Sequence, residues 1–172
     1  RIKQTDTSVP YKKGEYWYFT KTEEGKQYPT YLRGKAKDGS DAVVLLDQNE
    51  MAKGLKYFAI AEFDVSDDGN ILAFSTDTTG YRQYTLQFKD LRTGEILPDK
   101  VERVTSFVWT QDNKTVFFGT EDDVSKRSDI VWRHVLGSGK PVQVYNDKDV
   151  LFNVGVGLSR DGKMLFIGSG AK

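Results

Sequence analysis

The sequence predicts an all-β fold made of repeated antiparallel sheets, and three observations lead to this prediction. Aromatic residues make up 13% of the 172 residues and only four residues are proline, which favours strands over disorder. Four segments share one pattern, in which a turn of small and polar residues precedes a short aromatic strand. The turn residues Gly14, Gly69, Asn113 and Gly162 lie 55, 44 and 49 residues apart. Repeats of this length that contain only strand signals are typical of β-propeller blades.

The first repeat contains three strand signals, at residues 15–20, 28–33 and 42–46, with no clear inner strand ahead of them. A short helical turn is predicted at 49–54. Gly14 supplies the positive φ that a tight hairpin turn requires. This repeat is therefore predicted to be an incomplete blade.

The second and third repeats each predict four strands. In the second repeat the strands are 56–65, 70–76, a segment in which Tyr84, Leu86 and Phe88 alternate with polar residues, and 95–104. Alternation with period two predicts one buried face, and Pro98 is compatible with an outer edge strand. In the third repeat the strands are 106–110, 115–120, 129–135 and 141–145.

The fourth repeat has a strand signal before and after its turn at Gly162, and the sequence stops there. We divide residues 1–172 into blade-like repeats at about 9–55, 56–104, 105–148 and 149–172, the last truncated. A strand that lacks its neighbours exposes unpaired backbone groups, which natural proteins avoid. The sequence therefore predicts about three and a half four-stranded antiparallel blades of a larger parent.

Composition excludes several kinds of partner. Lys plus Arg equals Asp plus Glu, at 25 each, so no net field attracts nucleic acid or an anionic membrane. No apolar stretch is long enough to span a membrane. Cysteine is absent, which gives weak support for a reducing compartment; we expect a cytoplasmic protein, with the periplasm as the alternative.

Two residues could suggest hydrolytic chemistry. Ser159 lies in Gly157-Leu158-Ser159-Arg160-Asp161, which resembles a G-x-S-x-G nucleophile elbow but has Asp at the last position and leads into a hairpin turn. His134 is the only histidine and therefore the only possible imidazole base. We interpret Ser159 as a turn residue and His134 as a structural strand residue.

The remaining candidate sites also have structural interpretations. The acidic clusters at residues 64–68 and 121–123 lack the spacing of a calcium-binding loop. A single histidine is too few for a zinc site. Gly155 and Gly157 are not followed by the helix that a phosphate-binding loop requires. We therefore predict no catalytic, cofactor-binding or metal-binding residues and no cofactor. The features concerned are Asp64 with Asp67 and Asp68, residues 121–123, Gly155-Val156-Gly157, the glycosylation sequon Asn113-Lys114-Thr115, and the aromatic run 16–19.

An ordered series of segments resembles the N-terminal β-propeller of the prolyl oligopeptidase family of serine peptidases, and most of all its oligopeptidase B (protease II) branch. Each segment alone is a weak match to the family, but the segments occur in the family's order and with similar spacing along the whole chain. They are residues 19–29, 45–50, 82–86, 89–95, 108–109 with 112–115, and 131–137.

The resemblance implies a seven-bladed propeller that covers an α/β-hydrolase domain with a Ser-Asp-His triad. In that family the propeller admits only short peptides, and the oligopeptidase B branch cleaves after Lys or Arg. The chain would then be a non-catalytic gate, inactive alone, whose partner is the hydrolase domain of the same parent. Inner segments 57–65, 106–110 and 151–158 would line the channel, and loops such as 77–83 or 121–127 would contact the hydrolase domain.

Two other interpretations remain open. The repeats could form a protein-interaction scaffold with no peptidase domain, because blade repeats often hold partners. The chain alone could also have no activity and could self-associate, because open blade faces are apolar.

Overall fold

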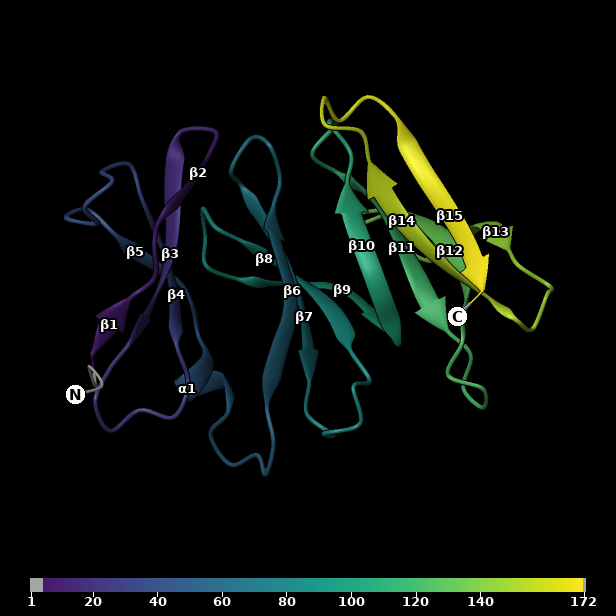
Figure 1. The fold of residues 1–172 in the computed structure, drawn as a ribbon. Coiled ribbons are helices and arrows are strands. Elements are labelled where there is room, and N and C mark those ends of the chain that lie inside the picture. The colour runs from purple at the N-terminus through teal and green to yellow at the C-terminus, as the bar shows by residue number, and fades with distance from the viewer. Residues whose placement is uncertain (1–4, 172) are drawn as a thin grey trace. The chain divides into compact units, whose positions relative to one another are not determined.

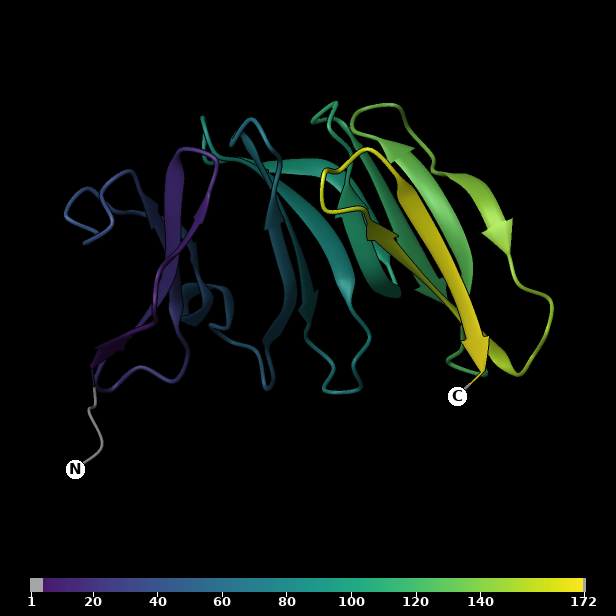
Figure 2. The ribbon, with the colours of Figure 1, turned by 45° about the horizontal axis from the view of Figure 1, so that its top comes forward.

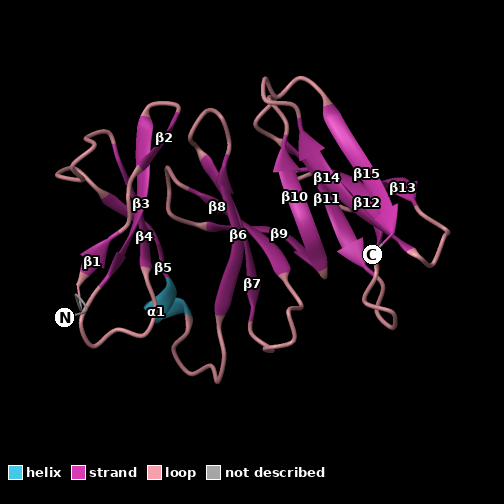
Figure 3. Cartoon of the chain, in the orientation of Figure 1, coloured by secondary structure: helices cyan, strands magenta, loops and turns pink. Residues whose placement is uncertain are grey.

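The computed structural model of the chain describes residues 5–171, which form β-strands and one short helix (Figures 1 and 3). Strands β1 to β5 form the first sheet, and each later sheet pairs consecutive strands by antiparallel hairpins. The first sheet contains β1 (Asp6–Thr7), β2 (Tyr11–Lys13), β3 (Tyr16–Thr22), β4 (Thr30–Gly34) and β5 (Val43–Asp47), followed by α1 (Gln48–Met51). The second contains β6 (Ala59–Val65), β7 (Ile71–Asp77), β8 (Thr85–Asp90) and β9 (Ile96–Glu102). The third contains β10 (Val104–Trp109), β11 (Thr115–Glu121), β12 (Ser128–Val135) and β13 (Val142–Asn146), and the fourth contains β14 (Phe152–Leu158) and β15 (Leu165–Ala171).

The chain divides into two compact units, which we describe separately. The first unit extends to Ala59 and includes Thr78–Gly80, and the second contains Ile60–Asp77 and the residues from Tyr81 onward. The second unit therefore holds nearly all of the second sheet together with the third and fourth sheets. No helix among residues 5–171 is long and apolar enough to cross a membrane.

The all-β prediction is confirmed, with its four-stranded antiparallel sheets in chain order. Strand β8 shows the predicted alternation, because Leu86 and Phe88 are fully buried while Thr85 and Gln87 are half-buried. The expected helical turn is α1, and the carboxylate of Asp47 caps it by accepting from the N–H groups of Asn49 and Glu50.

The prediction that the first repeat lacks an inner strand is wrong. Both β1 and β2 pair with β3 along its length, so the inner strand exists in two pieces. The break between them contains Pro10, which has no N–H to donate to a ladder. Sequence patterning missed the strand because neither piece exceeds three residues.

The predicted junction between the second and third repeats also shifts. Val104 does not end the outer strand but begins β10, and the turn between them is the single residue Arg103 at φ 61°. A non-glycine residue at positive φ gives no strong sequence signal. The inner strand β10 therefore begins two residues earlier than the predicted Ser106.

One apolar core lies between the second and third sheets. Trp109 is 3% exposed and packs edge-on against Phe88, with ring centroids 5.8 Å apart. Side chains in such cores sit at crystal-like density, so this core fixes the two sheets against each other. The buried members are Ile71, Ala73, Leu86, Phe88, Val104, Phe107, Trp109, Val116 and Phe118.

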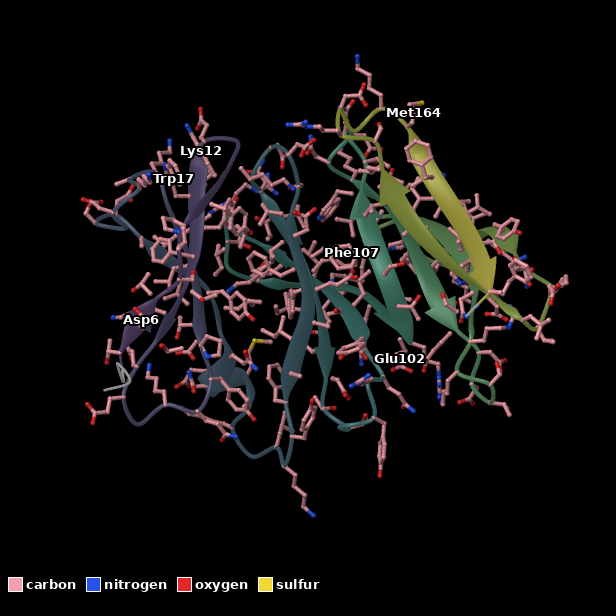
Figure 4. The ribbon with its side chains drawn as sticks, viewed as in Figure 1. Asp6, Lys12, Trp17, Glu102, Phe107 and Met164 are labelled. Atoms are coloured by element: carbon pink, nitrogen blue, oxygen red, sulfur yellow. The ribbon has the colours of Figure 1, made fainter. Side chains whose placement is uncertain are left out.

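The second unit has two different ends, because its strands alternate in direction. The hairpins between first and second strands lie at one end, which we call the turn end and define as residues 66–70, 110–114 and 159–164. The loop from β11 to β12 and the connection from β13 to β14 lie at the other end, which we call the loop end and define as residues 121–127 and 147–151. Figure 2 shows these hairpins and loops at opposite ends of the third and fourth sheets. In Figure 4, Met164 marks the turn end, and Phe107 lies in the interior.

Candidate functional site

Ser159 belongs to a hydrogen-bonded hairpin turn rather than to a nucleophile elbow. Its hydroxyl donates to Asp161 Oδ1 at 2.6 Å and accepts from the N–H of Met164 at 2.9 Å. Its backbone N–H donates to the carbonyl of Met164. The hydroxyl is therefore engaged at both its donor and an acceptor site, and a strand rather than a helix follows it.

The same turn occurs in the two preceding sheets. Ser66 donates to Asp68 at 2.6 Å, and Thr110 donates to Asp112 at 2.6 Å. In all three turns a hydroxyl precedes the aspartate by two residues, and a residue at positive φ follows the aspartate. Ser159 is thus the third copy of a structural residue, which confirms the turn interpretation of its sequence.

We expect Ser159→Ala to lower the free energy of unfolding by about 0.5–1.5 kcal/mol, the net worth of an intramolecular hydrogen bond. Urea unfolding measures this change, and Ser66→Ala, at the same position of a more buried turn, should cost at least as much. If Ser159→Ala abolished a hydrolytic activity while Ser66→Ala did not, the structural assignment would be wrong.

Asp112 is the most heavily bonded of the turn carboxylates. It accepts from the hydroxyls of Thr110 and Thr115 and from the N–H groups of Lys114 and Thr115, all within 2.9 Å. Desolvation raises the pKa of Asp112, but these hydrogen bonds outweigh desolvation and hold its pKa well below the ordinary value. The ionised form is therefore the one that the turn stabilises.

We expect Asp112→Ala to destabilise the protein by about 1–3 kcal/mol, because four donors lose their acceptor. The folded-state pKa of Asp112 is depressed, so its contribution is fully present above the unfolded pKa of about 3.9 and declines as the pH falls through the lower folded value. Unfolding measured from pH 7 to pH 2 should therefore show the difference between Asp112→Ala and wild type shrinking below about pH 4. The exposed neighbour Lys114→Ala serves as the control, and a pH-independent difference would contradict the assignment.

His134 lies on β12 in a buried pair with Asp99 of β9. Its Nε2 is 2.7 Å from Asp99 Oδ1, and their side chains are 3% and 8% exposed. The same carboxylate oxygen accepts from the N–H of Gly137 at 3.0 Å. The Nδ1 atom of His134 has no hydrogen-bond partner among the described residues, so no serine hydroxyl of this part of the chain is placed to use the imidazole. The structural interpretation of His134 fits this geometry.

Both acidic clusters are tied into turns and ion pairs. Asp68 accepts from Ser66 and Asn70, and Asp122 accepts from the N–H groups of Val124 and Ser125. Asp123 pairs with Arg103, which also reaches Glu121 at 3.5 Å. No group of three or more His, Cys, Asp or Glu side chains within residues 5–171 converges on a metal position.

The remaining motifs are also part of the fold. Gly155 and Gly157 lie inside β14 rather than in a phosphate-binding loop. The side chain of Asn113 accepts from the N–H of Asp68 and donates to the carbonyl of Gln111, so a glycan there would break a contact between two sheets.

In the first unit, Lys and Arg side chains lie over the rings of the aromatic run 16–19. The guanidinium of Arg33 lies 4.1 Å from the ring centre of Tyr16, and Lys12 and Lys37 lie 5.8 and 5.2 Å from that of Trp17. Figure 4 shows Lys12 and Trp17 together on this sheet. These distances are within the range of cation–π contacts.

The loop end of the second unit contains a concave surface. A pocket of 720 Å³ lies between the loop from β11 to β12 and the start of β14. Arg127 joins the two walls, because its guanidinium donates to the carbonyls of Phe152 at 2.9 Å and Asp147 at 3.2 Å. The residues that line this pocket are Asp122, Ser125, Arg127, Asp129, Val150, Leu151, Asn153 and Ala171.

The loop at 121–127 makes several hydrogen bonds and ion pairs although it is largely exposed. The N–H of Asp122 donates to the carbonyl of Arg127 at 2.8 Å, and its carboxylate accepts from Ser125. The hydrogen bonds from Ser125 lower the pKa of Asp122. Arg103, in the turn between β9 and β10, forms ion pairs with Glu121 and Asp123 of this loop. The loop is therefore held by its own hydrogen bonds and by ion pairs with Arg103.

Exposed aliphatic side chains gather on this loop end. Val124, Val150 and Leu151 are 90%, 78% and 69% exposed. The turn end carries mainly charged and polar side chains, with Met164 as its exposed apolar residue. The three aliphatic side chains make the loop end the more apolar of the two ends of the second unit. The sequence indicated the loop 121–127 but not residues 147–151. The two segments are connected through hydrogen bonds of Arg127, which the sequence does not reveal.

Successive four-stranded antiparallel sheets in chain order are the architecture of β-propeller blades. The family model for the prolyl oligopeptidase N-terminal β-propeller domain matches residues 1–172. The chain belongs to this family.

The relatives are peptidases. The chain is 40% identical over 185 aligned positions to dipeptidyl aminopeptidase BI of Pseudoxanthomonas mexicana, covering 97% of this chain and 26% of the relative. It is 32% identical over 183 positions to protease 2 of Moraxella lacunata, covering 100% and 26%. The structure of oligopeptidase B from Leishmania major matches with a TM-score of 0.91 and 31% identity, covering 98% of this chain and 24% of that chain.

The resemblance to the oligopeptidase B branch is confirmed by these comparisons. The chain spans about a quarter of the length of the relatives that it matches. These relatives have a further, catalytic domain beyond the matched region.

Proposed function

We propose that this chain acts as the access-controlling part of an oligopeptidase, in which it limits entry of peptides to a Ser-Asp-His site on an α/β-hydrolase domain. The observation that carries the proposal is the family match over residues 1–172 together with relatives that are named as peptidases. A propeller domain that lies beside a catalytic domain suits a gating role, because it can exclude large substrates by size. A cytoplasmic location, with the periplasm as alternative, is part of the same proposal.

The loop end is the surface that we assign to contact with the hydrolase domain. Its two loops are joined by Arg127 and present Val124, Val150 and Leu151 to a partner. Burial of three such aliphatic side chains would contribute about 1.5–3 kcal/mol each. The turn end offers charged and polar hairpins instead.

We propose cleavage after Lys or Arg as the first substrate class, on the basis of the similarity to protease 2 and oligopeptidase B. The 40% identity to a protein named dipeptidyl aminopeptidase BI favours a second candidate, the release of dipeptides from a free amino terminus. Both candidates place the specificity pocket outside these 172 residues.

Kinetics of the protein as its gene encodes it test this proposal. The substrates are a short peptide with one internal Lys, the same peptide with an acetylated amino terminus, and a folded protein that carries the same site. We expect kcat/KM for the short peptide to exceed that for the folded protein by at least tenfold. Acetylation should leave an oligopeptidase active and should stop a dipeptidyl aminopeptidase. Equal rates on short and folded substrates, or no hydrolysis of any of them, would overturn the proposal.

A further inference from the structure

The pocket at the loop end of the second unit has walls of two chemical kinds. The loop from β11 to β12 and the start of β12 contribute the carboxylates of Asp122 and Asp129. The connection from β13 to β14 contributes the aliphatic side chains of Val150 and Leu151. The pocket volume of 720 Å³ falls within the range of about 300–1,000 Å³ that small-molecule sites occupy. We call this surface the acidic pocket and define it by these four residues.

The carboxylate of Asp122 is bonded on one side only. Among the described residues, its three hydrogen bonds all end on Oδ1, and they come from the N–H of Val124 and from the N–H and hydroxyl of Ser125. The hydrogen bonds from Ser125 lower the pKa of Asp122, so the group is ionised at neutral pH. An ionised carboxylate accepts through both of its oxygens. Oδ2 therefore keeps its capacity to accept from a donor that enters the pocket.

The carboxylate of Asp129 is mostly buried and weakly bonded. Its side chain is 16% exposed, and its one hydrogen-bond contact among the described residues is the guanidinium of Arg127 at 3.5 Å, which is long for a hydrogen bond. Arg127 makes its shorter bonds to the carbonyls of Phe152 and Asp147, at 2.9 and 3.2 Å. A desolvated carboxylate without close donors is stabilised when a cation binds beside it.

The two walls together fit a cation on an aliphatic stem. Two carboxylates disfavour an anionic ligand, and Val150 and Leu151 are mostly exposed, so their apolar surface is available for contact. Lys and Arg side chains bury their methylene stems along apolar surface while the charged head stays in polar surroundings. A metal ion fits less well, because no group of three or more His, Cys, Asp or Glu side chains within residues 5–171 converges on one position.

We propose that the acidic pocket binds a Lys or Arg side chain of the peptide substrate, other than the residue at the cleaved bond. The charged head lies at Asp122 and Asp129, and the methylene stem lies against Val150 and Leu151. This inference rests on the proposed function, in which the loop end faces the hydrolase domain. It adds a preference for peptides with a further basic residue, and it assigns that preference to side chains of this chain.

The test is a set of short peptides hydrolysed by the protein as its gene encodes it. Each peptide has a free amino terminus and Lys at its second position, so that the bond after this Lys is cleavable under either candidate activity. A further residue is Lys, norleucine or Glu and is moved through the other positions in turn; norleucine keeps the stem and removes the charge. Mass spectrometry follows the one bond. At one position or more we expect KM to be lower for Lys than for norleucine by about two- to fivefold, as for a partly screened ion pair, and to be highest for Glu, with kcat unchanged.

Three variants assign this difference in KM to the acidic pocket. Asp122→Asn should remove the difference between the Lys and norleucine peptides. Val150→Lys gives the pocket a cation of its own and should also remove it, without a change to the hydrogen bonds of the loop 121–127, so it replaces Asp122→Asn if that variant fails to fold. Asp161→Asn is the matched control, because Asp161 is also a turn carboxylate that accepts from a serine hydroxyl and a backbone N–H, but at the turn end. It should leave the difference intact.

The outcomes separate this inference from the proposed function. Hydrolysis with equal KM for the Lys and norleucine peptides at every position would overturn this inference alone, as would a difference that persists in both Asp122→Asn and Val150→Lys. If Asp122→Asn raised KM equally for all three peptides, the pocket would hold the amino terminus of the peptide, and the assignment to a side chain would be wrong. No hydrolysis of any peptide would overturn the proposed function and this inference together.

Discussion

Trp109→Ala is expected to lower the free energy of unfolding by about 3–5 kcal/mol, the range for loss of a large buried aromatic side chain. Trp109 is 3% exposed in the core between the second and third sheets and packs edge-on against Phe88. Its indole N–H also donates to the carbonyl of Asp64 at 3.3 Å, so it connects two inner strands. Urea unfolding followed by circular dichroism measures the change.

A graded variant separates packing from hydrogen bonding at this position. Trp109→Phe keeps an aromatic ring and loses the donor, so it should cost less than the alanine variant. Val144→Ala, on the exposed strand β13, should change stability by less than about 0.5 kcal/mol. A loss below 1 kcal/mol for Trp109→Ala would contradict the assignment of a shared core.

Asp99→Ala is expected to destabilise the second unit by about 1–3 kcal/mol, because two donors, one of them buried, lose their acceptor. These donors are the imidazole of His134 and the N–H of Gly137, at 2.7 and 3.0 Å from Asp99. The contact joins β9, the outer strand of the second sheet, to β12 of the third sheet.

A double-mutant cycle with His134→Ala isolates the pair. We expect a coupling free energy of about 0.5–3 kcal/mol between the two positions, as for residues in direct contact. Strictly additive effects of Asp99→Ala and His134→Ala on urea unfolding would show that the two side chains do not interact in solution.

Local sequence signals predicted the parts of the fold that depend on local chemistry. The turn residues Gly69, Asn113 and Gly162 all adopt positive φ, and the alternation at Leu86 and Phe88 correctly identified a buried face. The four-stranded sheets followed from these turns and strands.

Features that depend on distant residues were not predictable from the sequence. Arg103 at φ 61° ends one strand and begins the next without glycine, and the broken inner strand β1–β2 is too short to show a period. The bond between Asp99 and His134 spans 35 residues of sequence. The joining of two loops by Arg127 depends on carbonyl positions that only the fold determines.

The candidate surface shows the same division. The sequence singled out 121–127 as a charged loop, but it did not show the ion pair with Arg103 or the internal hydrogen bonds of the loop. The glycines of β14 were noted as a strand segment, whereas their open face appears only when β15 is placed beside them.

The central claim is that the loop end contacts a further domain, and amide hydrogen exchange tests it most directly. Exchange is compared between the 172-residue chain and the protein as its gene encodes it, for residues 121–127 and 147–151 and for the turn-end residues 110–114. We expect slower exchange at both loop-end segments in the encoded protein and unchanged exchange at the turn end. Added protection at 110–114 alone, or no added protection at either end, would contradict the account.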